Sequence, residues 1–280
     1  MRLVKYVKDG SERVGDLNPD GTVTPLPWAS LDELYATGDV LKAVRGVVRT
    51  GEVPVQPDRI LAPVTSTSKV IGTGGNYADH AAEAASRLQV REPVFMPFLT
   101  ASVIGQDAAI RIPTEDTFTD YEVELSVVIG KVAHRLTEAN AMDYVAGYTI
   151  VNDVSARDVM ERELLQVMLS KSPDTFVPVG PAIVTVDEVP DPYSLEISTR
   201  LNGEIRQHSN TGNMMVRIPR ILEMITTYIT LNPGDIVTTG TPGGVGFFRD
   251  PQESMQPGDT IEAVVESIGV LSNPVEAGWT

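Results

Sequence analysis

The 280-residue chain contains no cysteine, which excludes disulfide bridges, zinc–thiolate sites, iron–sulfur clusters and thiol nucleophiles. It also lacks long hydrophobic runs, because the longest apolar stretches, 126–130 and 261–265, fall far short of the roughly 20 residues that span a bilayer. The first residues are charged throughout, so we expect no signal peptide. The predicted location is therefore the cytoplasm.

Basic residues are scarce: 22 Lys and Arg stand against 38 Asp and Glu, which gives a net charge of −16. Such a surface repels phosphate backbones and anionic lipids, so neither nucleic acid nor a membrane is a predicted partner. The hydrophobic fraction of 42% is enough for a folded core, and the length fits one large domain, alone or with a small one.

The first 65 residues are predicted to form a small N-terminal α/β unit. Turn signals at 9–10 and 18–21 separate short strand-like runs, and Ser30 with Glu33 forms a capping box before a helix. Three prolines between 52 and 64 indicate an extended connector. We therefore predict two domains, 1–65 and 66–280.

Residues 66–280 contain more strands than helices. We predict strands at 69–72, 123–130, 147–152, 195–201, 205–208, 236–239 and 260–268, and helices at 77–88, 156–169 and 219–229. Asn202-Gly203 is a strong hairpin signal between two of these strands. Because the helices do not alternate regularly with the strands, the pattern favours a β-rich α+β fold.

Two glutamates stand at the start of the apolar strand 123–130. Strand residues two apart face the same side, so Glu122 and Glu124 project together, and Asp120 could join them. Like charges on one face are unfavourable unless solvent or a cation separates them. The pair therefore indicates either a site for a hard cation such as Mg²⁺ or a solvated strand end.

Another carboxylate, Asp153, follows the apolar strand 147–152. Strand ends are common places for metal-binding or catalytic carboxylates, and the alternative here is a plain turn. Ser155 is predicted to cap the helix that comes next.

His80 and Glu83 lie three residues apart in a predicted helix and so share one face. A carboxylate that orients an imidazole raises its basicity, so the two are either a water-activating pair or a surface pair. Lys171 could neutralise a developing enolate or lie in solvent. The glycine-rich loop 238–246 could present backbone amides to an anion.

Taken in order, these segments resemble the fumarylacetoacetate hydrolase family over roughly residues 66–275. The resemblance rests on Asn76-Tyr77-Ala78-Asp79-His80, Tyr121-Glu122-Val123-Glu124-Leu125, Asn152-Asp153-Val154-Ser155-Ala156-Arg157-Asp158, Ser170-Lys171-Ser172 and Thr239-Gly240-Thr241-Pro242 with Gly244-Val245-Gly246. It implies a mixed β-sandwich roll as catalytic domain, a homodimer, and Mg²⁺ as cofactor, with Mn²⁺ or Ca²⁺ as alternatives. The family's site residues fall on Glu122, Glu124 and Asp153 for the metal, on His80, Glu83 and Lys171 for catalysis, and on Arg157 and Thr241 for substrate binding.

The implied activity is a hydrolase that cleaves a C–C bond in a β-diketo acid of the acylpyruvate or fumarylpyruvate type. The reaction would pass through an enolate that the metal stabilises, with His80 and Glu83 activating water. Decarboxylation, isomerisation or tautomerisation, and dehydration of sugar acids are alternatives within the family. A catalytically weak protein that binds a metal and a keto acid is an alternative of another class.

Three positions depart from the family pattern. Met160 stands where a glutamine is frequent, Gly75 stands where a bulkier residue is usual, and 95–98 lacks the lysine of many members. All three changes reduce polarity or bulk near the expected pocket. We therefore expect a less polar or differently shaped substrate, or a weaker activity.

Overall fold

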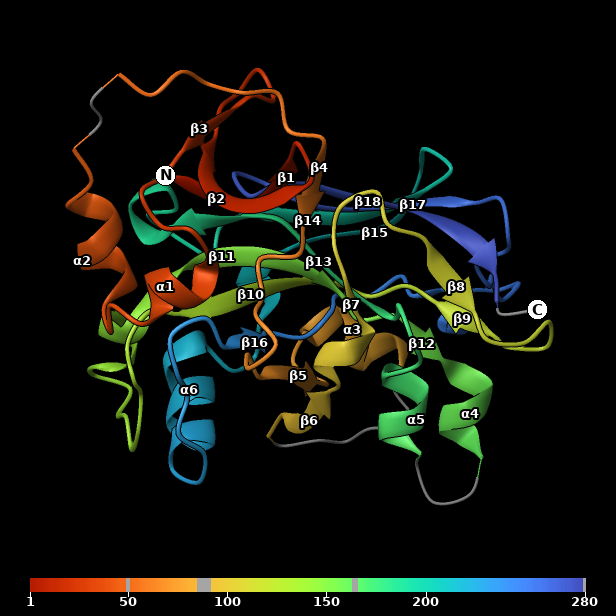
Figure 1. The fold of residues 1–280 in the computed structure, drawn as a ribbon. Coiled ribbons are helices and arrows are strands. Elements are labelled where there is room, and N and C mark those ends of the chain that lie inside the picture. Colours follow the sequence, from red (N-terminus) through yellow and green to blue (C-terminus); the bar gives the residue numbers. More distant parts are fainter. Residues whose placement is uncertain (49–50, 85–91, 163–165, 279–280) are drawn as a thin grey trace.

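A sheet of eleven strands runs through the molecule (Figure 1). The computed structural model describes residues 1–48, 51–84, 92–162 and 166–278. In spatial order the sheet contains β3 (Val23–Pro25), β2 (Ser11–Leu17), β1 (Arg2–Lys8), β13 (Val177–Thr185), β11 (Val145–Asn152), β10 (Val123–Ile129), β16 (Ile236–Thr238), β5 (Val70–Gly74) and β6 (Val94–Phe98). Two short strands lie off this path: β4 (Arg59–Leu61) pairs with β1, and β7 (Val103–Ile104) pairs with β13.

A second sheet packs against the first, with the order β15 (Glu204–Asn210), β14 (Glu196–Leu201), β17 (Thr260–Val265), β18 (Gly269–Ala277) and β8 (Ile110–Ile112). A third, small sheet pairs β9 (Thr119–Asp120) with β12 (Ser155–Ala156). Leu125 and Ile150 of the large sheet share a hydrophobic cluster with Ile197 and Val265 of the second. The predicted β-rich α+β class and its mixed β-sandwich are confirmed.

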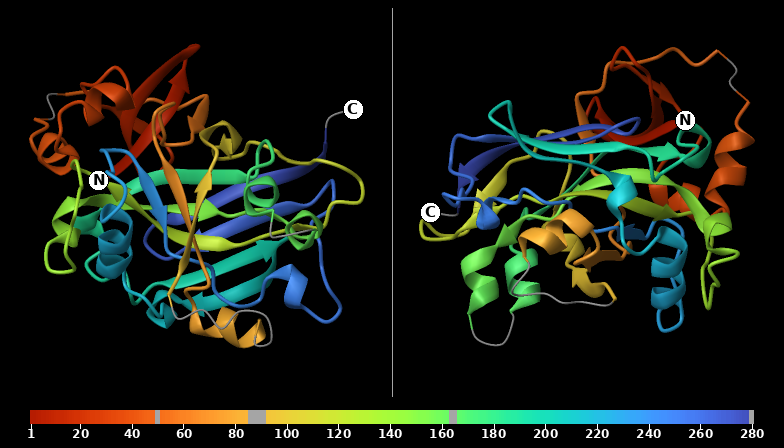
Figure 2. Two further views of the ribbon diagram at one scale, coloured as in Figure 1. Left: turned by 90° about the horizontal axis from the view of Figure 1, so that it is seen from below. Right: turned by 180° about the vertical axis from the view of Figure 1, so that it is seen from behind.

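The helices are short: α1 (Leu31–Tyr35), α2 (Val40–Arg45), α3 (Ala78–Glu83), α4 (Arg157–Glu161), α5 (Val167–Lys171) and α6 (Ile218–Thr226). The last four lie below strands β13, β11 and β10 of the large sheet in Figure 1 and in the right-hand view of Figure 2. Ile218, Ile221, Leu222 and Ile225 give α6 one apolar face, which packs into the main cluster. No helix in the described ranges has the length and apolar character that crossing a membrane requires.

Several local predictions are confirmed. Asn202 and Gly203 both have positive φ, as a two-residue hairpin turn between β14 and β15 needs. The Ser30 hydroxyl accepts from the Glu33 amide and caps α1. The Glu33 carboxylate accepts from the amide of Ala29 rather than from that of Ser30, so the predicted capping box forms only in part.

Two helix predictions need correction. The predicted helix 156–169 is two helices, α4 and α5, because the chain becomes extended at Arg162; 163–165 lie outside the described residues. Ser155 does not cap α4, since it pairs with Asp120 in a strand and its hydroxyl donates to the carbonyl of Asp153. The helix predicted at 77–88 is described from Ala78 to Glu83, with Ala84 as its C-cap, and 85–88 lie outside the described residues.

The N-terminal strands continue the large sheet. Leu3 of β1 pairs with Ile183 of β13, and a single hydrophobic cluster contains Leu34 of α1 together with Val128 and Val177. The domain boundary at residue 65 stays a prediction.

Candidate metal centre and active site

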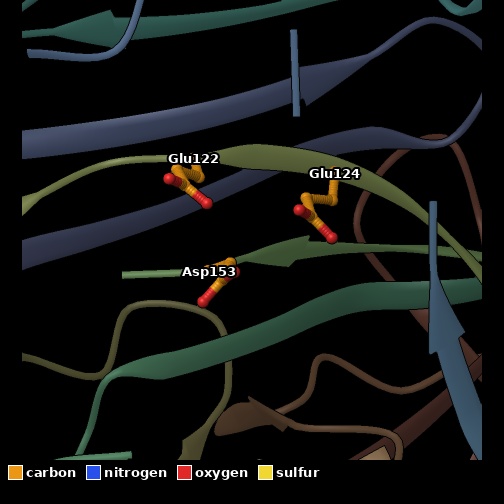
Figure 3. A group of neighbouring side chains, drawn as sticks. All are labelled: Glu122, Glu124 and Asp153. Atoms are coloured by element: carbon orange, nitrogen blue, oxygen red, sulfur yellow. The ribbon is translucent and has the colours of Figure 1, made fainter. Parts of the chain in front are cut away.

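Three buried carboxylates converge where two central strands of the large sheet meet. Glu122 precedes β10, Glu124 lies within it, and Asp153 follows the neighbouring strand β11. One oxygen from each lies within 4.8 Å of the other two, and Figure 3 shows both glutamates leaving the same side of β10. The structure therefore brings the three predicted ligands together, in the interior and not at a solvated strand end.

The pairing of β10 with β11 positions these acids. Val123 lies opposite Asn152, which aligns the start of one strand with the end of the other. The Asn152 side chain accepts from the amide of Glu122 at 3.0 Å, and the amide of Asp153 donates to the carbonyl of Glu122 at 2.9 Å. These two hydrogen bonds fix the backbone at Glu122 and Asp153.

Two positively charged side chains, Lys171 and Arg157, contact the acids. Lys171, at the end of α5, donates from Nζ to Glu122 and to Asp153, at 2.7 Å in each case. Arg157, at the start of α4, donates to Glu122 and to Asp120. Asp120 thus binds Arg157 and the amides of the 246–247 loop, and it does not join the three candidate ligands.

The donor set fits a divalent cation. Among the described residues, the four buried acids of the site are accompanied by two cationic side chains, Arg157 and Lys171, with which three of the acids form ion pairs. The acids are Asp120, Glu122, Glu124 and Asp153, so two negative charges are left when all of them are ionised. Within the described part of the chain, no donor reaches Oε2 of Glu124 or Oδ1 of Asp153, although both atoms are buried. Partnerless buried oxygens are costly, and a hard oxygen-seeking ion would satisfy them.

The surroundings raise the pKa of two of the three acids and lower the pKa of the third. Burial, reinforced by the charges of Asp153 and Glu122, raises the pKa of Glu124 well above its ordinary value. Burial also raises the pKa of Asp153 to about 7, although Lys171 opposes the shift. At Glu122 burial acts in the same direction, but Lys171 and Arg157 outweigh it and hold the pKa of that carboxyl below its ordinary value.

His80 and Glu83 form the predicted pair on α3. Nδ1 of His80 lies 2.8 Å from Oε1 of Glu83, and the amide of Gly244 donates to the other oxygen of Glu83 at 2.8 Å. With Nδ1 engaged by the carboxylate, Nε2 is the ring nitrogen left for chemistry. The His80 ring also lies 5.9 Å from that of Phe248, so a packed aromatic ring helps to orient it.

Thr241 reaches the site from the loop after β16, but its hydroxyl is already bonded. It donates to the carbonyl of Val123 at 3.0 Å and accepts from the Gln207 side chain at 2.8 Å. Sequence reasoning missed Gln207, because β15 is polar at every position except Ile205 and nothing in the sequence marks this one residue as buried in a polar network.

A cavity of about 180 Å³ unites these groups. One part of its wall consists of the polar site residues His80, Glu122, Glu124, Asp153, Arg157, Lys171 and Thr241. Another part is apolar, formed by Val94, Met96, Met160 and Val167. The structure thus places Met160 in the wall, and Gly75, which has φ +72°, also borders the cavity.

Residues 69–276 match the family model described as the C-terminal domain of fumarylacetoacetate (FAA) hydrolase. The chain belongs to the fumarylacetoacetate hydrolase family. Over 288 residues it is 42% identical to the mitochondrial oxaloacetate tautomerase fahd2 of Xenopus laevis, with 98% of this chain and 90% of the relative covered. Its family membership makes it an enzyme of this class, and the acidic cluster could bind a metal, as is typical of the family.

Solved structures of other family members agree. A fumarylacetoacetate hydrolase from the psychrophile Exiguobacterium antarcticum is 35% identical with a TM-score of 0.83, and 99% of each chain is covered. A 2-hydroxyhepta-2,4-diene-1,7-dioate isomerase from Mycobacterium marinum is 31% identical with a TM-score of 0.79, and all of both chains is covered. These family members carry the names of different reactions, so the predicted hydrolysis is not confirmed. The cytoplasmic location also stays a prediction.

Proposed function

We propose that this family member tautomerises or isomerises a 2-oxo acid of the oxaloacetate type, with Mg²⁺ held by Glu122, Glu124 and Asp153. The observation that carries the proposal is the buried acidic cluster with two partnerless oxygens, in the same cavity as His80 and Lys171. The relatives named as a tautomerase and an isomerase support it. The keto-acid partner and the homodimer belong to the same proposal, and sedimentation velocity measures the latter.

A bound divalent cation would hold the adjacent carboxylate and keto oxygens of the substrate and stabilise negative charge on the keto oxygen. The chain's own residues then handle the proton. Nε2 of His80 accepts a proton from the carbon next to the keto group, while Glu83 stabilises the resulting imidazolium through Nδ1. Lys171 places a positive charge beside the acids, and the same His80 returns the proton to oxygen or to carbon.

Hydrolytic C–C cleavage is the second candidate, and the geometry of His80 and Glu83 favours it. Glu83 accepts from His80 and from the Gly244 amide, so the imidazole is held rigidly with Nε2 available to activate water. In this reaction water supplies the proton that His80 removes. Proton transfer at carbon and attack by water are therefore separable by experiment.

The test compares two substrates in Mg²⁺ and in EDTA. Decay of the enol absorbance of oxaloacetate reports tautomerisation, and loss of acetylpyruvate absorbance reports cleavage. We expect Mg²⁺-dependent acceleration of the first, which Glu124→Gln abolishes and His80→Asn lowers by about 10²–10⁴-fold. His208→Asn is the matched control, because His208 also pairs with a glutamate, Glu196, yet is largely exposed.

The outcomes separate the candidates. Rapid cleavage of acetylpyruvate without faster oxaloacetate tautomerisation would replace the first candidate with the second. Rates in His80→Asn and Glu124→Gln equal to those of the unaltered chain would refute both.

A further inference from the structure

In the described part of the chain, β10 has no strand partner on one side at the point where its acids lie. β16 pairs with β10 only from Ser126 to Val128 and ends at Thr238. Val123 lies between Glu122 and Glu124, and its N–H and C=O are therefore beyond the reach of the pairing with β16. Buried backbone groups of this kind need partners.

Gln207 and Thr241 take the place of the missing strand. Oε1 of Gln207 accepts from the amide of Val123 at 3.0 Å, and the hydroxyl of Thr241 donates to the carbonyl of Val123 at 3.0 Å. Gln207 also donates to Thr241, at 2.8 Å. The two side chains thus bind both backbone groups of the residue between the candidate metal ligands, and Gln207 is completely buried.

The same glutamine reaches the loop that orients the His80–Glu83 pair. Nε2 of Gln207 also donates to the carbonyl of Pro242 at 2.8 Å, two residues before the Gly244 amide that binds Glu83. Gly244 packs closely on β15: a Cβ atom there would lie 2.5 Å from the carbonyl oxygen of Arg206 and 3.1 Å from Cα of Gln207. Movement of Gln207 would therefore disturb both the acidic cluster and the His80–Glu83 pair.

We infer that Gln207 is a positioning residue that holds Glu122 and Glu124 at the spacing needed for the cation. It also keeps the 242–244 loop in a fixed position relative to these two acids. It acts through Val123 and Thr241 and touches neither the cation nor the substrate. The inference deepens the proposed function and rests on it, because the acids must hold a cation. Partners that orient metal ligands typically contribute about 10- to 100-fold to metal affinity.

The test uses Gln207→Met in the full chain, because methionine preserves the length and removes the hydrogen bonds. Calorimetric titration with Mn²⁺ alone is expected to show binding weakened by about 10- to 100-fold. Hydrogen exchange of the Val123 amide is expected to become faster. Thr241→Val breaks the same network from its other side and is expected to weaken Mn²⁺ binding in the same direction, which keeps the inference testable if Gln207→Met does not fold.

Asn273→Leu is the matched control. Asn273 is a buried amide on β18 that donates to the carbonyls of Gly105 and Ala108, and it is not among the residues that line the site cavity. The substitution is expected to lower the melting temperature but to leave the Mn²⁺ affinity and the hydrogen exchange of the Val123 amide unchanged. If Gln207→Met and Thr241→Val bind Mn²⁺ as tightly as the unaltered chain, the positioning role is refuted. An unaltered chain that binds no Mn²⁺ would refute the proposed function, and this role with it.

Discussion

The excess of negative charge in the cluster leads to an unusual prediction for Glu124→Gln. In the metal-free protein, one oxygen of Glu124 is buried without a donor, and the neighbouring acids add repulsion. Glutamine has nearly the same shape but no charge. We therefore expect the substitution to stabilise the protein in EDTA and to destabilise it, relative to the unaltered chain, in excess Mg²⁺.

The magnitudes follow from the surroundings of the side chain. A buried polar group without a partner costs on the order of 2 kcal/mol. For a chain of this size that corresponds to a rise of roughly 4–8 °C in melting temperature. Mg²⁺ at a hundred times its dissociation constant stabilises the unaltered chain by about 2.7 kcal/mol, and Glu124→Gln forfeits that gain. The order of the two melting temperatures should therefore reverse.

The assay is thermal unfolding followed by circular dichroism at pH 8, in EDTA and in saturating Mg²⁺. Glu196→Gln is the matched control, because Glu196 is exposed and its loss should change stability by less than about 0.5 kcal/mol in either buffer. Lys171→Met should act in the opposite direction in EDTA, since it removes the cation that two buried acids share. If Glu124→Gln melts below the unaltered chain in EDTA, or responds equally to Mg²⁺, the reasoning is wrong.

Three further predictions follow from single contacts. The raised pKa of Asp153, about 7 in the folded chain, means that the folded state binds more protons than the unfolded state between about pH 4 and 7. Metal-free stability should therefore fall as the pH rises through this window, by up to about 4 kcal/mol, and urea titrations at pH 5 and pH 8 should show a smaller fall for Asp153→Asn. Glu83→Gln should lower kcat by about 10- to 100-fold while calorimetry shows unchanged Mn²⁺ affinity, because Glu83 orients His80 and touches no candidate ligand; a matching loss of Mn²⁺ affinity would contradict this. Ser30→Ala should cost about 1 kcal/mol in urea unfolding through loss of the α1 cap, with no change in activity.

The two glutamates were predictable as a pair because strand alternation is local and places Glu122 and Glu124 on one face. Asp153 joined them only through the family resemblance, and the pairing of β10 with β11 places it beside them in the structure. Burial was not predictable in the same way. Whether a pair of glutamates at a strand end faces solvent or the interior depends on the second sheet and on α5, which come from distant parts of the sequence.

β13 shows a different limit. The segment 177–185 was absent from the predicted strands, and Pro178 and Pro181 argue against a central strand, yet β13 lies between β1 and β11. The pairing explains the exception, since the register with β11 shifts between Tyr148 and Ile150, next to Gly180 and Pro181. The irregularity accommodates a residue with no amide hydrogen. The local prolines are visible in the sequence, but the pairing with β11 that accommodates them comes from a distant segment and is not.

The network around Val123 also has a consequence for the order in which the chain folds. The three acids lie within about thirty residues of one another and meet as soon as β10 pairs with β11. The side chains that bind the backbone between the glutamates, Gln207 and Thr241, lie 84 and 118 residues after Val123 in the sequence. Closing such long loops is slow, and during synthesis Thr241 leaves the ribosome well after the acids do. The nascent protein therefore carries its three candidate ligands before Gln207 and Thr241 can hold them in place, so the proposed metal site is completed only in the last stage of folding.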